Sequence, residues 1–151
     1  MIAAICNFAN RILGRGDATI ATTGRVHFGP LADMTSAQFT LGLQDKLLGQ
    51  VRLALLGQAQ LNDGGSITLT TGILTEQPIA LGANATAVNA ALEGFVRAAA
   101  LGLPRGLRIN AVSPSVLVEA WDDYADFFPG FEAVSAARAA LAYQRSVDGI
   151  A

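Results

Sequence analysis

The fold is decided by residues 64–115, which read GGSITLTTGILTEQPIALGANATAVNAALEGFVRAAALGLPRGLRINAVSPS. This stretch contains two β-prone runs, SITLTT at residues 66–71 and LRINAV at residues 107–112. Between them, residues 84–103 carry apolar side chains at helical spacing. A strand, a helix and a second strand in this order predict a βαβ unit whose two strands lie parallel.

The residues before this stretch extend the same pattern. ATIAT, at residues 18–22, predicts a further buried strand that stops at a loop. Thr35 and Gln38 match a capping box, and the apolar spacing that follows predicts a helix over residues 36–61. Residues 62–65, Asn-Asp-Gly-Gly, predict a turn before the next strand.

Three strands that alternate with long helices indicate an α/β protein. We expect a partial Rossmann-like three-layer sandwich, in which a small parallel sheet carries packed helices on both faces. The length of 151 residues favours one domain, residues 1–151. The spacing of apolar residues also predicts a short helix at residues 2–13 and a helical segment at residues 131–146.

The composition limits the classes of partner. Hydrophobic residues make up 52% of the chain and charged residues 15%, so we expect burial of apolar surface between subunits. The net charge of -2, without a cluster of basic residues, argues against nucleic acid. No apolar run reaches the roughly 18 residues that cross a bilayer. The lone Cys6 and the lack of a basic leading segment fit a cytoplasmic protein.

From about residue 17 to residue 147, the chain resembles the later half of the short-chain dehydrogenases/reductases, whose Rossmann-type domain binds NAD or NADP. The resemblance rests on four segments in the family's order: DATIATTG at 17–24, GGSITLTTG at 64–72, NAALEGFVRAAALGL at 89–103 and LRINAVSPS at 107–115. It implies that the ends of two strands border the cofactor. The implied cofactor-binding residues are Thr23, Gly24, Pro114 and Ser115.

The sequence departs from the family pattern at the positions that carry chemistry. The family's Gly-rich turn, which holds the cofactor pyrophosphate, is not recognised, so we expect an N-terminally truncated relative. The resemblance assigns Gly72 to the catalytic serine position, Ala85 to the tyrosine position and Asn89 to the lysine position. The cofactor therefore stays unknown, and whether the protein is an enzyme stays open.

One substitution suggests a compensation. The resemblance aligns Lys46 with a helical asparagine of the family and Asn89 with its catalytic lysine, which is an apparent exchange. If both face one pocket, Lys46 supplies a charge, Thr71 orients a ligand oxygen and His27 supplies a proton. The alternative interpretation makes Lys46 a solvated or partner-facing lysine, and gives His27 a role in a loop or an interface.

Two functions follow from these observations. The first is an oligomeric small-ligand-binding or scaffold unit without the family's NAD(P)-dependent redox activity. The alternative is an atypical oxidoreductase, or another small-molecule enzyme, that uses Lys46 and His27 in a remodelled pocket. In either case we expect a homodimer or homotetramer formed through the helices at 36–61 and 84–103. The acidic residues at 119–126 predict a solvated face, so no metal site is expected.

Overall fold

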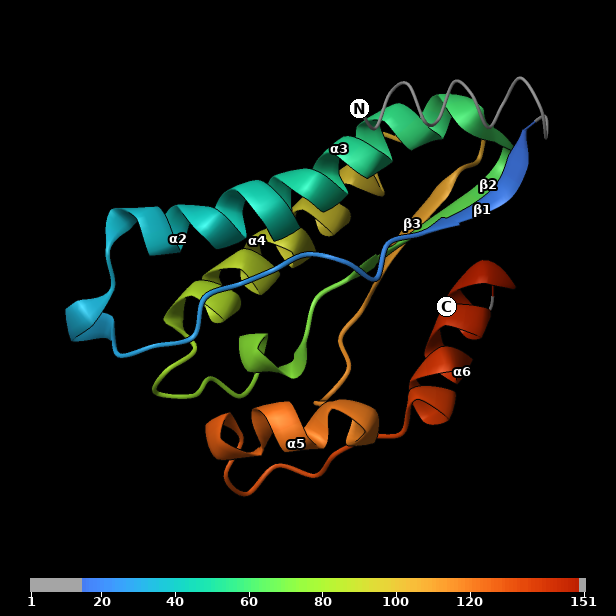
Figure 1. Cartoon of the computed structure of the whole chain (residues 1–151). Coiled ribbons are helices and arrows are strands. Elements are labelled where there is room, and N and C mark those ends of the chain that lie inside the picture. The colour runs from blue at the N-terminus through green and yellow to red at the C-terminus, as the bar shows by residue number, and fades with distance from the viewer. Residues whose placement is uncertain (1–14, 150–151) are drawn as a thin grey trace.

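The computed structural model describes residues 15–149, which contain one sheet of three parallel strands in the order β1-β2-β3 (Figure 1). The strands are β1 (Gly16–Ile20), β2 (Leu61–Thr70) and β3 (Arg108–Val112). Their order and direction confirm the predicted parallel sheet. The helix predicted at residues 2–13, together with Cys6, lies outside the described residues.

The turn predicted at residues 62–65 is wrong, because these residues belong to β2. Gly16 pairs with Leu61 and Ala18 pairs with Ser66. Between these two pairs the chain advances by five residues in β2 but by only two in β1. The extra residues form an irregularity in the strand, and Gly64 takes a φ of 77° there. Turn-type residues thus make a bulge inside a strand.

Two long helical segments cover one face of the sheet (Figure 1). The first runs through α2 (Ser36–Gly42), a π-helical turn (Leu43–Leu47) and α3 (Leu48–Gly57). The second is α4 (Ala83–Ala99).

The helix predicted to reach residue 61 ends earlier, at Gly57, and a 3-10 turn (Gln58–Gln60) leads into β2. The capping box is confirmed: Gln38 N donates to Thr35 Oγ1 over 3.2 Å, and Thr35 N donates to Gln38 Oε1 over 2.8 Å.

The opposite face of the sheet carries α6 (Ala136–Val147), which completes a three-layer arrangement (Figure 1). This helix begins five residues later than predicted, because Ser135 caps it and accepts a hydrogen bond from Arg138 N over 3.3 Å. The Glu119 carboxylate also accepts from Ala136 N at this end. The predicted α/β class and the three layers are confirmed.

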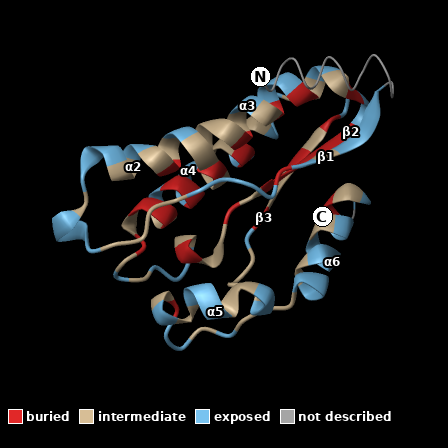
Figure 2. Cartoon of the chain, viewed as in Figure 1, coloured by how far each residue is buried: buried red, intermediate tan, exposed pale blue. Residues whose placement is uncertain are grey.

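The core lies between the sheet and the helices α3 and α4 (Figure 2). Its fully buried side chains include Ile67, Leu69, Val88 and Leu92. The prediction that the strand at 18–22 is buried is wrong for most of its residues, because β1 is an edge strand and only Ala21 is buried.

A short helical segment lies across the carboxyl ends of the strands, below them in Figure 1. It consists of a 3-10 turn (Val118–Ala120), α5 (Trp121–Tyr124) and a second 3-10 turn (Ala125–Phe127). Its acidic side chains are exposed, and no group of His, Cys, Asp or Glu within residues 15–149 could hold a metal ion. Over the same residues, no helix is both long enough and apolar enough to cross a membrane.

Candidate functional site

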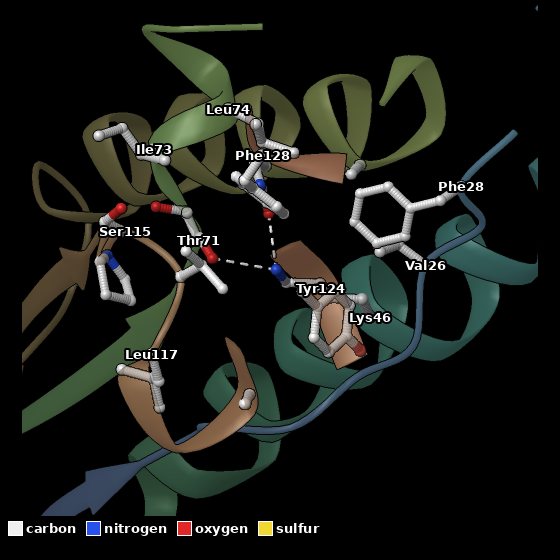
Figure 3. A pocket seen from close by; sticks show the side chains of 16 residues that line it. Val26, Phe28, Lys46, Thr71, Ile73, Leu74, Ser115, Leu117, Tyr124 and Phe128 are labelled. Atoms are coloured by element: carbon white, nitrogen blue, oxygen red, sulfur yellow. Dashed lines mark hydrogen bonds between the residues drawn. The ribbon is translucent and has the colours of Figure 1, made fainter. Parts of the chain in front are cut away.

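A pocket of about 230 Å³ opens where β2 and β3 end, between α4 on one side and the α5 segment on the other (Figure 3). Most of its wall is apolar. Its lining residues are Val26, Phe28, Lys46, Thr71, Gly72, Ile73, Leu74, Ala85, Asn89, Pro114, Ser115, Val116, Leu117, Ala120, Tyr124 and Phe128. The carboxyl ends of parallel strands are where α/β proteins commonly bind ligands.

Lys46 reaches this pocket from the π-helical turn (Figure 3). Its Nζ donates to Asn89 Oδ1 over 2.7 Å and to the Thr71 carbonyl oxygen over 3.0 Å. Both acceptors are neutral, so they orient the amine without neutralising its charge. Burial therefore dominates the titration, and it lowers the pKa of Lys46 from 10.5 to about 8.

Two glycines make room for this arrangement. Gly24 has a φ of 129°, and a Cβ at residue 24 would lie 2.6 Å from the Lys46 Cβ, so only glycine lets the loop pass the lysine. A Cβ at Gly72 would lie 3.1 Å from Asn89 Nδ2, which is a tight contact. Glycine at residue 72 thus leaves space for the buried amide that holds Lys46.

Thr71 and Asn89 are both buried, each with 3% of its surface exposed. The Thr71 carbonyl is used by Lys46, whereas its buried hydroxyl Oγ1 has no hydrogen-bond partner among residues 15–149. A buried hydroxyl without a partner costs free energy unless a ligand or water meets it. Thr71, which lines the pocket, therefore carries a hydroxyl that no protein group among residues 15–149 satisfies.

The structure brings most of the predicted site residues together. Pro114 and Ser115 line the same pocket as Lys46, Thr71 and Asn89. Ser115 is also fixed from outside, because its hydroxyl donates to the Glu132 carbonyl oxygen over 2.7 Å.

Three predicted site residues, His27, Thr23 and Gly24, do not line the pocket. His27 does not line the pocket; its backbone N–H donates to Asn84 Oδ1 over 2.9 Å, and its ring lies beside Gly29. Thr23 is exposed, and its carbonyl oxygen accepts from Gln50 Nε2 over 3.1 Å. The His27 side chain lies against Gly29 of the same loop and not against the pocket.

Sequence reasoning missed the aromatic side of the pocket. Phe28 lies 6.0 Å from Tyr124, 5.2 Å from Phe127 and 6.4 Å from Phe128, measured between ring centroids. The aromatic residues of the α5 segment gave the only sequence signal for this wall. Their partner Phe28 follows β1 by eight residues, and nothing in its spacing indicated the contact.

Gln50 was also missed, although it follows Lys46 by one helical turn. It is 2% exposed, and its Nε2 donates to Thr23 O and to Thr70 O, while its Oε1 accepts from Thr70 N over 2.8 Å. This side chain fixes the ends of β1 and β2 where the pocket begins. A glutamine among apolar helix positions was the available signal.

Lys46 is the only lysine in the chain, which has nine arginines. An arginine stays charged in proteins, whereas a buried lysine can lose its proton near neutral pH. The only amine side chain of the protein therefore lies in its apolar pocket.

Comparisons with known proteins agree with this architecture. A protein-family model described as Enoyl-(Acyl carrier protein) reductase matches residues 1–151. No curated protein matches the chain. Among solved structures, the protein lin1944 from Listeria innocua is 45% identical, with a TM-score of 0.91 over 99% of this chain and 74% of its own.

Two further structures are more distant. A small-chain dehydrogenase in complex with NADPH is 28% identical, with a TM-score of 0.82, and the match covers 97% of this chain and 73% of that protein. A short-chain dehydrogenase from Burkholderia cenocepacia in complex with NADP is 21% identical, with a TM-score of 0.83 over 97% of this chain and 64% of that protein. The second likeness bears on the fold alone.

Proposed function

Because the chain belongs to the short-chain dehydrogenase/reductase family, as the sequence resemblance predicted, we propose that it uses the family's substrate region as a binding pocket for a small, mainly apolar molecule. Lys46 holds the polar end of that molecule. The observation that carries this proposal is the Lys46 amine, fixed by Asn89 and Thr71 inside an apolar pocket.

The same pocket argues against the family's usual redox chemistry. That chemistry requires a tyrosine hydroxyl beside a lysine. Ala85, at the position that the resemblance assigns to the tyrosine, lines the pocket and is 2% exposed. The methyl group of Ala85 cannot exchange a proton. Asn89, at the position assigned to the catalytic lysine, accepts a hydrogen bond from Lys46 and carries no charge of its own.

The fit to a nicotinamide dinucleotide is only partial. Pro114 and Ser115 supply a wall at one end. In the family, the cofactor pyrophosphate is held by a Gly-rich turn that connects a strand to a helix. Residues 15–149 contain no such turn, so this part of the chain lacks the family's pyrophosphate site. We therefore propose ligand binding without hydride transfer.

The size and polarity of the pocket limit the ligand. Its volume of about 230 Å³ is below the roughly 300–1,000 Å³ of sites for drug-sized molecules. No carboxylate from residues 15–149 lines it, which leaves Lys46 available to pair with a ligand anion or carbonyl oxygen. A suitable ligand has one apolar body and one oxygen-bearing end.

Calorimetric titration with trans-cinnamate, which combines an aromatic body with a carboxylate, tests this proposal. We expect saturable binding that weakens roughly tenfold to a hundredfold in Lys46→Met, because a hydrogen bond to a charged group contributes about 1.5–3 kcal/mol. Arg52→Met is the matched control, since it removes an exposed cation that does not line the pocket. Equal affinity in wild type and Lys46→Met contradicts the proposal.

The relative bound to NADPH favours a second candidate, an atypical oxidoreductase. In that case Lys46 Nζ holds a proton at the substrate oxygen, and His27, which lies outside the pocket, is dispensable. Saturable quenching of NADPH fluorescence below about millimolar concentration, with carbonyl reduction lost in Lys46→Ala and kept in His27→Ala, favours this candidate. The absence of both signals favours ligand binding.

Self-association through the helices at 36–61 and 84–103 also stays a proposal. Leu55 on α3 is 54% exposed, and a groove between α3 and α4 is lined by Leu55, Phe95 and Leu103. Apolar surface of this kind favours a contact between copies. Light scattering should give a dimer or tetramer at micromolar concentration, and a smaller species for Leu55→Glu. A monomeric wild type contradicts this proposal.

A further inference from the structure

The Lys46 amine has a defined orientation in the pocket. Its Nζ contacts two acceptors, Asn89 Oδ1 and the Thr71 carbonyl oxygen (Figure 3). No third acceptor contacts it among residues 15–149. Lys46 lines the cavity, and these two hydrogen bonds leave one tetrahedral position of its nitrogen unused by the described residues.

From this geometry we propose that Lys46 is a carbonyl-capturing nucleophile, which forms an imine with small apolar aldehydes that enter the pocket. The inference rests on the proposed function, because it uses the same pocket and the same apolar ligand body. It adds a covalent step and names the class of ligand as an aldehyde.

The step needs no oxidant, reductant or metal. The Nζ lone pair attacks the aldehyde carbon, a C–N bond forms, and the carbonyl oxygen takes up the proton that the nitrogen loses. The resulting carbinolamine then loses its hydroxyl, together with the second nitrogen proton, as water. The product is a C=N bond between Lys46 and the former aldehyde carbon, and one water is released for each aldehyde bound.

Two hydrogen bonds prepare the nitrogen for this role. A neutral amine has two N–H bonds and one lone pair. When the two N–H bonds point at Asn89 and Thr71, the lone pair takes the remaining tetrahedral position and is not used by a hydrogen bond of the protein. Because both acceptors are neutral, neither favours the ammonium form as a carboxylate would.

The surroundings of Lys46 favour the neutral form. Burial lowers the pKa of this residue to about 8, so about a tenth of the molecules carry a free amine at pH 7. Desolvation in an apolar pocket is an established way to activate a lysine nucleophile. The one carboxylate next to it in sequence, Asp45, is bound to Arg25 through a 2.9 Å ion pair.

The lining favours an apolar aldehyde over a charged one. The apolar body of the aldehyde would pack against apolar side chains of the lining, which include Val26, Phe28, Leu74 and Phe128. Thr71, which also lines the pocket, carries a hydroxyl without a protein partner among residues 15–149, and it is a candidate donor for the oxygen that becomes hydroxyl in the carbinolamine. A charged group on the aldehyde's substituent would have no charged side chain to pair with among the other described lining residues.

The test uses trans-cinnamaldehyde with cyanoborohydride, which reduces an imine to a stable amine. Because the chain has one lysine, intact mass and peptide mapping distinguish Lys46 from the only other amine, the chain's α-amino group. We expect one reduced adduct at Lys46, formed at pH 7 more than about tenfold faster than on Nα-acetyl-lysine amide.

Three comparisons make the result decisive. Lys46→Arg keeps the charge but should form no adduct at residue 46. Wild type unfolded in guanidinium should lose the rate advantage, a readout that needs no variant to fold. Ala120→Phe, which narrows the pocket and keeps Lys46, should slow labelling several-fold.

Other outcomes overturn the inference. A folded protein labelled only at its α-amino group, or a Lys46 that reacts no faster than the free lysine derivative, excludes imine formation. Glyoxylate reacting as fast as cinnamaldehyde excludes the preference for apolar aldehydes. Cinnamate binding that depends on Lys46 without any adduct retains the pocket and removes the imine, so the two proposals fail separately.

Discussion

Two polar clusters lie on opposite faces of the same sheet. Successive side chains of β2 alternate between the faces, so Thr68 and Thr70 point toward α6 while Leu69 points toward the core under α4. Thr71, the residue after β2, lines the Lys46 pocket. One cluster surrounds Ser146 on α6, and the other is the Lys46 pocket. They differ in whether their polar groups are satisfied by the protein itself.

The Ser146 cluster is satisfied internally. Ser146 Oγ lies 2.7 Å from Thr68 Oγ1 and accepts from Asn110 Nδ2 over 3.1 Å. Arg108 donates to the carbonyl oxygens of Ser146 and Val147, both over 2.8 Å, which completes the C-terminal end of α6. These bonds dock α6 against the sheet.

The Lys46 pocket is satisfied only in part. Its lysine uses two of three possible hydrogen bonds, and the buried Thr71 hydroxyl uses none within residues 15–149. A closed polar network stabilises a packing arrangement, whereas an incomplete one beside a cavity is suited to binding. We expect changes in the first to affect stability, and changes in the second to affect binding and pH dependence.

The largest effect is expected from the titration of Lys46. Between pH 8 and 10.5 the unfolded chain keeps a proton that the folded chain has lost, so the free energy of unfolding should rise by about 3 kcal/mol as pH increases through this range. Below pH 8 the cost of burying the charge is present in full. Urea unfolding at several pH values, in wild type and Lys46→Met, measures this difference.

Among residues 15–149, Tyr124 is the only other titratable side chain that lines the pocket. It is present in both proteins, so the comparison isolates Lys46. Parallel stability curves for wild type and Lys46→Met would show that the lysine titrates normally. That result would remove the electrostatic difference between the two clusters.

The second prediction concerns the satisfied cluster. Ser146→Val should reduce the free energy of unfolding by about 2 kcal/mol, because it leaves the fully buried Thr68 hydroxyl without its Ser146 partner and deprives Asn110 Nδ2 of an acceptor. Denaturant unfolding measures the loss. The rate at which cinnamaldehyde labels Lys46 should not change, and a matching loss of labelling would mean that the two faces are coupled.

The third prediction converts the pocket to an ion pair. Asn89→Asp places a carboxylate 2.7 Å from Lys46 Nζ, which raises the pKa of the lysine and favours the ammonium form. Labelling by cinnamaldehyde at pH 7 should fall about tenfold, equivalent to about 1.4 kcal/mol. Asn89→Ser, which adds no charge, is the control. Faster labelling in Asn89→Asp would contradict the role of the neutral acceptor.

The sequence predicted the layers and part of the site for physical reasons that apply locally. The capping box of Thr35, the apolar spacing of α4 and the β-prone runs act over a few residues, so they identify elements. The apparent exchange of Lys46 and Asn89 raised the question of whether both side chains face one pocket, and in the structure both line it. That inference came from the family resemblance, because periodicity places each residue only within its own helix.

Other features depend on contacts that no local pattern contains. The bulge at residues 62–65 depends on the register between β1 and β2, which is fixed only when the strands pair. Phe28 meets the α5 segment across about a hundred residues of chain. The loop around His27 is held by distant residues too, because His27 N donates to Asn84 Oδ1 and Gly29 N donates to Leu81 O. Such long-range contacts decide which candidates reach the pocket.

The smallest expected effect tests redundancy in the α6 contact. Thr70 Oγ1 lies 2.8 Å from the Tyr143 hydroxyl, and it also donates to the Ala21 carbonyl oxygen over 2.6 Å. Because Thr70 keeps the second bond and Tyr143 is only half-buried, Tyr143→Phe should cost at most about 1 kcal/mol of unfolding free energy. Denaturant unfolding of Tyr143→Phe and Ser146→Val measures the two losses side by side. Thr70 keeps its bond to Ala21 when Tyr143 is changed, whereas the Thr68 hydroxyl loses its Ser146 partner. Equal losses in the two variants would mean that α6 docks through its whole length, and the difference between the faces would then depend on the Lys46 pocket alone.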